Sequence, residues 1–184
     1  MKQINTYINE KLRLSAKNTY TCQPTSKDEL RRIIIYRIKN EGNECDLNDI
    51  DTSKITSMSA LFDVNLNKIF KDFNGDISQW DVSNVTNMSL MFQGCKKFDC
   101  DISRWNTSNV KTMEAMFDEC EKFNQDLSQW DVSNVENMNY MFDFCKEFKQ
   151  NLDAWDVDTK KLKYRMKYAF RWCPTQPKWY DKYN

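Results

Sequence analysis

The feature that most constrains this chain is a 25-residue repeat. Four tryptophans mark its period, at Trp80, Trp105, Trp130 and Trp155. Three full copies occupy residues 76–100, 101–125 and 126–150, a degenerate copy occupies 151–173, and an upstream copy occupies 46–62. A period of roughly 20 to 50 residues indicates a solenoid, in which each unit buries its apolar face by stacking on its neighbours.

Two patterns alternate within each copy. Residues 77–82 alternate with period two, which predicts a short strand, although its phase stays open. Val85, Met88, Met91 and Phe92 are spaced as i, i+3, i+6 and i+7, which predicts one or two helical turns. We therefore expect an α/β solenoid, leucine-rich-repeat-like, with about five 25-residue repeats of a short parallel strand plus a short helix or turn. The recurring Trp, Val, Met, Phe and Cys columns should form its core.

The ends of the array should be capped. Ser26 and Glu29 fit a capping box, an apolar stripe at helical spacing follows, and Gly42 is a typical stop. Residues 4–12 could form a second, short amphipathic helix. We expect an N-terminal helical cap over residues 1–45, the repeat solenoid over 46–173 and a C-terminal capping tail over 174–184, all in one structural domain.

The formal net charge of zero conceals a segregation along the chain. Residues 1–45 carry a balance of +4, residues 46–157 one of -10 and residues 158–184 one of +6. Either the basic ends compensate a solvated acidic array, or they engage something anionic or the acidic flank of another copy.

The residue inventory argues against catalysis. The 184 residues include no histidine and three glycines, which removes histidine-based acid–base chemistry, histidine-ligated metals and a glycine-rich phosphate loop. We expect a monomer that is not an enzyme and holds no cofactor or metal. No apolar run approaches the roughly 18 residues of a membrane helix.

Seven cysteines suggest stacked thiols rather than a disulfide framework. Cys95, Cys120 and Cys145 share one repeat position, Cys173 follows at a shifted one, and the count is odd. Such a column predicts buried, reduced thiols, which agrees with a cytoplasmic setting for the chain as given.

Polar columns also recur. Asp76, Asp101 and Asp126 open successive copies, and such a column is either a calcium-binding edge or, as we favour, a set of turn residues that accept nearby backbone amides. Asn84, Asn109 and Asn134 should form an asparagine ladder that closes backbone hydrogen bonds in each turn.

The string that begins at Asp76 resembles the repeat of BspA-like surface proteins, also called the mycoplasma-type lipoprotein-associated repeat, a divergent branch of the leucine-rich repeats. The hallmarks are Trp80–Val85 and Met91-Phe92, and the match covers residues 46–173. The resemblance implies parallel strands backed by short helices or turns, roles in adhesion and protein binding, and a cell-surface or virion-associated location. The N-terminal helix followed by residues 46–56 is similar to short forms from gut bacteria and their phages.

Function should therefore lie in positions that differ between copies and in the basic ends. We expect a protein-binding module, with nucleic-acid binding or a structural role in an assembly such as a phage particle as alternatives. The basic-aromatic stretch 160–183 fits either a nucleic-acid surface or a capping helix with its aromatics inward, which we favour. The candidate partner-binding residues are Gln79, Arg104, Gln129, Lys111, Glu136, Glu114, Lys160, Lys161 and Lys163.

Overall fold

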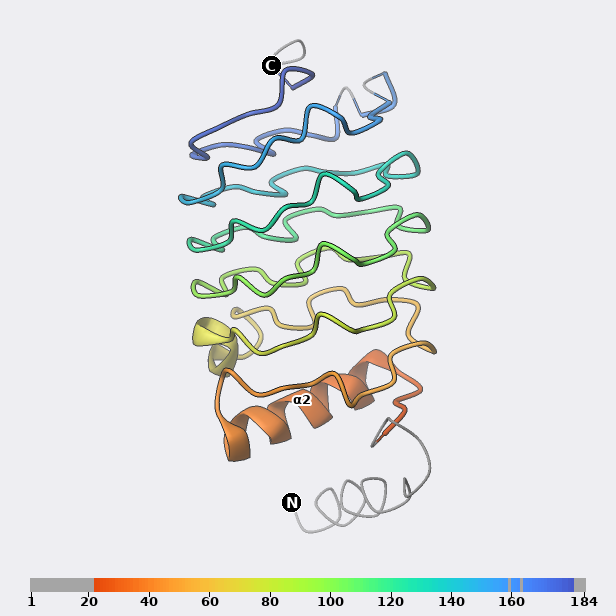
Figure 1. Cartoon of the computed structure of the whole chain (residues 1–184), viewed down its shortest axis with the longest axis vertical. Helices are drawn as coiled ribbons and strands as arrows, with labels where there is room; N and C mark the ends of the chain where they lie inside the picture. The colour runs from red at the N-terminus through yellow and green to blue at the C-terminus, as the bar shows by residue number, and fades with distance from the viewer. Residues whose placement is uncertain (1–21, 159, 163, 181–184) are drawn as a thin grey trace.

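The chain winds into a stack of coils that rise along the long axis of the molecule, as the computed structural model shows (Figure 1). The structure describes residues 22–180 except 159 and 163. We number the coils 1 (residues 46–75), 2 (76–100), 3 (101–125), 4 (126–150) and 5 (151–173). Within the described residues the helices are α2 (Lys27–Glu41) and the 3-10 helix η1 (Lys68–Asp72).

The predicted α/β solenoid of parallel strands and short helices is wrong. The described part of the chain holds no strand and no sheet, and no helix lies in coils 2 to 5. Neighbouring segments meet instead in five isolated bridges, all parallel, among them Ser57 with Asn87, Asn87 with Thr112 and Thr112 with Asn137.

The strand and helix predictions failed because the spacing of buried residues within a coil was misinterpreted. Buried residues recur every third position over much of a coil, and the N–H of one donates to the carbonyl of the buried residue three places earlier. Trp80 donates to Ile77 at 3.1 Å, Met91 to Met88 at 3.2 Å and Cys95 to Phe92 at 2.9 Å. This is a chain of tight turns, with a period near three, which lies between that of a strand and that of a helix.

Left-handed residues interrupt any extended run. One column has positive φ at Leu90 (61°), Ala115 (49°) and Tyr140 (58°), and a second has it at Glu119 (60°) and Phe144 (57°). Residues other than glycine pay roughly 1 to 2 kcal/mol for this conformation. Inter-coil hydrogen bonds hold them in it, since the N–H groups of Leu90, Ala115 and Tyr140 donate to the next coil at 2.8 to 2.9 Å.

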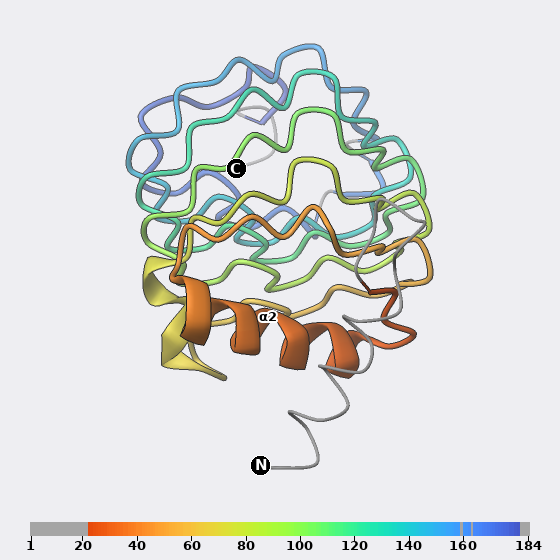
Figure 2. The ribbon, with the colours of Figure 1, turned by 60° about the horizontal axis from the view of Figure 1, so that its bottom comes forward.

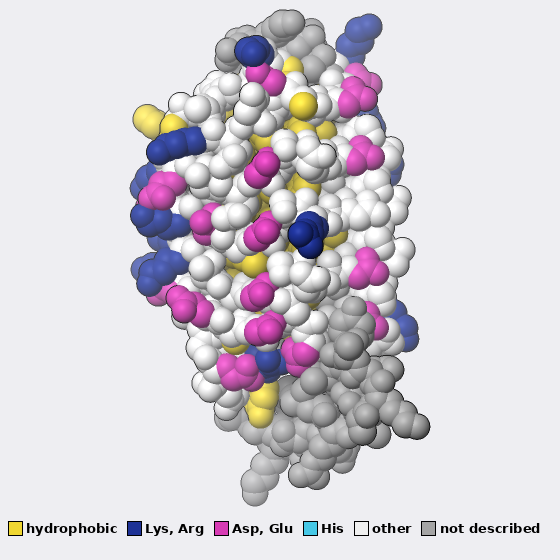
Figure 3. Space-filling view, in the orientation of Figure 1, with side chains coloured by type: hydrophobic (Ala, Val, Ile, Leu, Met, Phe, Trp, Pro, Cys, Tyr) yellow, Lys and Arg dark blue, Asp and Glu magenta, His cyan; other side chains and the backbone are white. Residues whose placement is uncertain are grey.

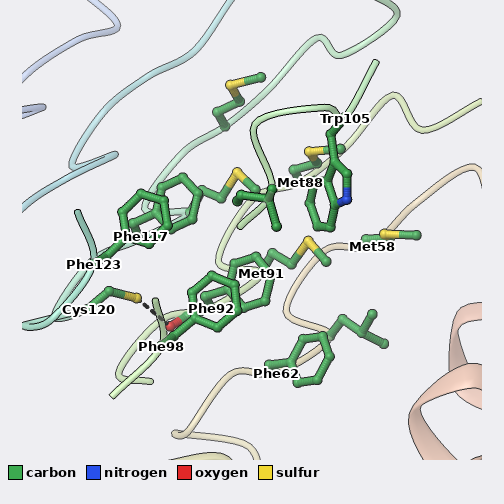
Figure 4. Packing of buried hydrophobic residues seen from close by; sticks show 14 of the residues in the cluster. Met58, Phe62, Met88, Met91, Phe92, Phe98, Trp105, Phe117, Cys120 and Phe123 are labelled. Atoms are coloured by element: carbon green, nitrogen blue, oxygen red, sulfur yellow. Dashed lines mark hydrogen bonds between the residues drawn. The ribbon is translucent and has the colours of Figure 1, made fainter. Parts of the chain in front are cut away.

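The interior consists of side-chain ladders that run through the stack. Two phenylalanine columns lie face to face, with ring centroids 3.9 Å apart for Phe92 and Phe98 and 4.1 Å apart for Phe117 and Phe123 (Figure 4). Along one column, Phe92 stacks on Phe117 at 5.7 Å. Every one of these rings is fully buried, which removes a large apolar area from water in each coil.

The polar edges of the core also form ladders. The indoles of the four repeat tryptophans each donate to a backbone carbonyl one coil earlier, as Trp130 does to Ile102 at 3.1 Å. The predicted asparagine ladder is confirmed: Asn84, Asn109 and Asn134 donate to Ser53, Ser83 and Ser108 at 2.7 to 2.9 Å. The cysteines of the predicted column are buried, and their Sγ atoms donate to phenylalanine carbonyls: Cys95 to Phe62, Cys120 to Phe92 and Cys145 to Phe117.

Helix α2 lies across the N-terminal end of the stack (Figure 2). The predicted start is confirmed, because Ser26 Oγ accepts the Glu29 N–H at 3.2 Å and the helix ends before Gly42, which has φ 93°. Its apolar stripe is buried, with Leu30 and Ile34 at zero exposure. The helix expected at residues 4–12 lies outside the described residues.

Candidate functional site

The candidate residues chosen from the sequence do not converge on one site. Gln79, Arg104 and Gln129 are exposed and stand beside the tryptophan column. Arg104 lines a shallow hollow of about 500 Å³ together with Asp76 and Asp101. Because this hollow is open and its polar side chains already face water, we assign it no ligand.

The remaining candidates in the described part of the chain mainly form ion pairs and hydrogen bonds within the chain. Lys161 pairs with Glu136 one coil below at 3.2 Å, and Lys111 Nζ donates to Asn134 at 3.4 Å. Glu114 is half-buried and accepts a hydrogen bond from Asn137 at 3.0 Å. Lys160 is exposed, and its backbone N–H donates to Asp158. Lys163 lies outside the described residues.

The aspartate columns serve turns. Asp76, Asp101 and Asp126 each accept the N–H of the serine two places on, at 2.8 to 3.0 Å. Figure 3 shows acidic side chains in a column along one face, with lysines and arginines gathered at its edge. Within the described residues, no group of three or more histidine, cysteine, aspartate or glutamate side chains is placed to hold a metal ion.

The helix expected over residues 160–183 is wrong for the described part of that segment, which is non-helical. The predicted inward direction of the aromatics holds for Tyr180, which is 5% exposed, and for Trp179, which packs against the core. It is wrong for Tyr164 at 81% exposure, Tyr168 at 37% and Trp172 at 65%, which face outward.

These outward rings join rings of coil 4 in one surface. Tyr168 lies on Tyr140 with centroids 5.5 Å apart, and Trp172 stacks on Phe144 at 5.9 Å. We call Tyr140, Phe144, Tyr168 and Trp172, with Lys167 and Arg171, the C-terminal aromatic surface. All four rings project from the two columns of left-handed residues, which turn their side chains out of the stack.

Cations lie directly over these rings. The Arg171 guanidinium carbon is 4.5 Å from the Tyr168 ring centre and 5.4 Å from that of Phe144, and Lys167 Nζ is 4.7 Å from the Tyr168 ring. Such contacts stabilise both partners, by roughly 0.5 to 1 kcal/mol at exposed sites. These contacts favour the arrangement of the rings seen in the structure.

A buried carboxylate orients Arg171. Asp143 is 2% exposed and accepts Arg171 Nε on both oxygens, at 2.9 and 3.2 Å. The hydrogen bond with Asp143 raises the pKa of Arg171, which stays charged. One coil below, burial raises the pKa of Asp118 to about 6, with the Asp143 and Glu119 charges adding to the effect. The column that contains Asp118 and Asp143 thus ends beneath the C-terminal aromatic surface.

Sequence reasoning missed Tyr140 and Phe144 as surface residues. Their column equivalents are small, aliphatic or charged in earlier coils, namely Leu90 and Ala115 for Tyr140, and Gly94 and Glu119 for Phe144. The increase in ring size toward the C-terminus was the available signal. It was overlooked because the helical spacing assigned to this segment obscured which columns point outward.

Comparison with known families gives the chain its class. The family model described as Mycoplasma protein of unknown function, DUF285, matches residues 35–155 and 64–179. The chain belongs to this family. No curated protein and no solved structure matched it. In the part of the chain that the structure describes, none of the helices is long and apolar enough to cross a membrane.

Proposed function

We propose that the chain is a non-catalytic protein-binding module whose interface is the C-terminal aromatic surface. The observation that carries this proposal is the 65% exposure of Trp172 beside Tyr168 and Arg171. Tryptophan, tyrosine and arginine are the residue types most enriched among the residues that dominate binding energy at protein interfaces. An exposed tryptophan without such a use costs solubility.

The matched family is described as one of unknown function, so membership leaves the role open. We further propose that this chain is a short BspA-like protein of the kind found in gut bacteria and their phages. The support is the helix followed by the first repeat motif and the array of about five copies. The resemblance to BspA-like repeats favours adhesion to another protein over chemistry.

A pull-down from the native host tests the proposal. Wild-type chain and the control Gln129→Ala, altered in an exposed residue beside the tryptophan column, should both retain a stoichiometric protein. The double variant Tyr168→Ala/Trp172→Ala should lose it, and nuclease treatment should have no effect. Equal retention by the double variant and the control would place the interface elsewhere and overturn the assignment.

Nucleic-acid binding is the second candidate, because Lys167 and Arg171 lie over exposed rings of the same surface. Bases stack on such rings, and cations meet the phosphates. Salt-dependent retention on single-stranded DNA that Tyr168→Ala/Trp172→Ala abolishes, together with loss of the protein partner after nuclease treatment, would favour this function over protein binding.

A further inference from the structure

Along the segment that carries the left-handed residues, consecutive coils are joined by backbone donors that point toward the C-terminal end. In coil 4, the N–H groups of Tyr140, Phe142 and Phe144 donate to the carbonyls of Lys167, Ala169 and Arg171 at 2.8 to 2.9 Å. Coil 3 donates to coil 4 in the same register, from Ala115, Phe117 and Glu119 to Asn139, Met141 and Asp143. Each coil thus binds the next through alternate residues.

Coil 5 repeats these donors without a coil to receive them. The equivalent residues are Tyr168, Phe170 and Trp172, and the described part of the chain supplies no acceptor for their backbone N–H groups. Tyr168 and Trp172 are 37% and 65% exposed and have a left-handed φ, 57° and 65°, like their counterparts in coil 4. Phe170 between them is 1% exposed and lies under Trp179 and Tyr180, so the accessible donors are those of Tyr168 and Trp172. A row of aligned donors is a ready template for another chain.

We propose that this edge binds an extended, acidic segment of a partner polypeptide, which supplies backbone carbonyls to the N–H groups of Tyr168 and Trp172. The inference rests on the proposed protein-binding function and specifies its partner. Addition of an extended segment to an open edge gives affinity through main-chain hydrogen bonds and specificity through side-chain contacts. The exposed rings of Tyr168 and Trp172 supply those contacts at the same edge.

The charge of the edge selects an acidic segment. Residues 158–184 carry a balance of +6. Arg171, Lys161 and Lys178 pair with carboxylates of coils 4 and 5. Arg165 and Lys167 are exposed and make no ion pair with a described residue, so their charge is available to a partner.

A second copy of the chain does not fit the edge. Its own N-terminal carbonyls are covered, because Arg31 of α2 donates to the backbone oxygens of Ala60 and Leu61. Two C-terminal edges placed together would oppose donor to donor. A segment from a different polypeptide is therefore the occupant that satisfies the donors.

A peptide taken from the chain itself provides the probe. Residues 136–144 already accept hydrogen bonds in the required register from coil 3, and Glu136 and Asp143 give them a net charge of -2. A labelled peptide of this sequence with blocked ends should bind the full chain in fluorescence anisotropy, with a Kd of roughly 10 to 100 μM. The control peptide carries lysine at both acidic positions and should bind at least about tenfold more weakly.

Hydrogen exchange by NMR reads the edge directly. Bound peptide should slow exchange of the Tyr168 and Trp172 amides by about tenfold or more, and leave the Met91 and Cys95 amides unchanged. Arg165→Glu/Lys167→Glu should reverse the preference between the two peptides, whereas Lys111→Glu should keep it. This reversal is a gain of binding, which a misfolded variant could not produce.

Two results overturn the inference. One is absence of binding up to about 1 mM peptide, and the other is binding that leaves the Tyr168 and Trp172 amides unprotected. If the pull-down depends on Tyr168 and Trp172 while the amides stay unprotected, protein binding stands and edge addition fails. If oligothymidylate protects these amides and the peptide does not, the edge serves nucleic acid.

Discussion

The two ends of the stack close in different ways. At the N-terminal end, α2 buries Leu30, Ile33 and Ile34, and Arg31 satisfies carbonyls of coil 1. At the C-terminal end, residues 174–180 cover the tryptophan side and the Phe170 ring: Trp179 donates to the Leu152 carbonyl at 2.8 Å, and Tyr180 packs on Phe170 with centroids 5.1 Å apart. Tyr168 and Trp172 keep exposed rings and backbone donors that have no acceptor among the described residues.

The N-terminal end is closed by contacts that stabilise the stack, whereas the C-terminal end leaves groups that a partner can contact. Trp179 extends the tryptophan ladder by one more step, since its indole bonds the preceding coil as Trp155 bonds Leu127. Residues 174–180 thus imitate a coil along the tryptophan side. A fully capped end would have no unsatisfied backbone groups to offer.

Alanine substitutions at the two ends should differ most in their effect on the free energy of unfolding. Ile34→Ala removes a fully buried side chain of α2 and should lower the free energy of unfolding by about 3 kcal/mol. Trp172→Ala removes a larger side chain, but one that is 65% exposed, and should change it by less than about 0.5 kcal/mol. Urea unfolding followed by fluorescence measures both. Similar costs would show that the C-terminal rings are part of the core.

The cap cation gives the next largest effect. Arg31→Ala leaves carbonyls of coil 1 without donors and should cost about 2 kcal/mol in the same assay. Arg32→Ala, on the exposed side of α2, should cost less than about 0.5 kcal/mol. If both variants behave alike, α2 acts through apolar contacts alone, and the carbonyls of coil 1 are satisfied by water.

The sequence predicted the ladders and the cap because both depend on local or strictly repeated signals. Ser26, Glu29 and Gly42 define α2 within one segment, and the Asn84 column repeats at a fixed interval. Residues that recur once per coil must stack, whatever the backbone does between them. These inferences needed no knowledge of the conformation inside a coil.

The conformation within a coil and the C-terminal aromatic surface were not predictable in the same way. A spacing of i, i+3, i+6 suits a helical turn as well as successive tight turns, and the left-handed φ of Leu90 or Tyr140 has no sequence marker such as glycine or asparagine. The direction of the Tyr140 and Phe144 side chains depends on that conformation. The aromatic surface therefore became visible only with the fold.

The charge columns between the ends should give opposite pH responses. Because Asp118 has a folded pKa of about 6, above its ordinary value of 3.8, the unfolded chain loses this proton first as pH rises. Its contribution to stability is therefore lost between about pH 4 and pH 6. Asp118→Asn should remove this decline and be more stable than wild type at pH 7 by about 1 kcal/mol, a value discounted for partial exposure.

Glu121 is the matched control. Hydrogen bonds from Lys96 and Lys146 lower its pKa to about 2, so its contribution is lost as pH falls below about 4.5. When urea unfolding is measured at a series of pH values, Glu121→Gln should reduce the pH dependence of the free energy of unfolding only in that acidic range. If Asp118→Asn flattens the same acidic range and leaves the interval from pH 4 to 6 unchanged, Asp118 is not buried as the stack requires.

The smallest effect concerns two ion pairs of equal length at opposite ends. Arg37 meets Asp49 at 2.8 Å with 13% of the arginine side chain exposed, whereas Lys178 meets Asp153 at 2.8 Å with 89% of the lysine exposed. Water screens the second pair, so Lys178→Ala should leave the urea midpoint unchanged, whereas Arg37→Ala should lower the free energy of unfolding by about 1 kcal/mol or more. Urea midpoints at low and high salt measure both. Equal effects of the two substitutions would mean that burial does not strengthen the ion pair. Ion pairing would then not distinguish the closed N-terminal end from the open C-terminal end.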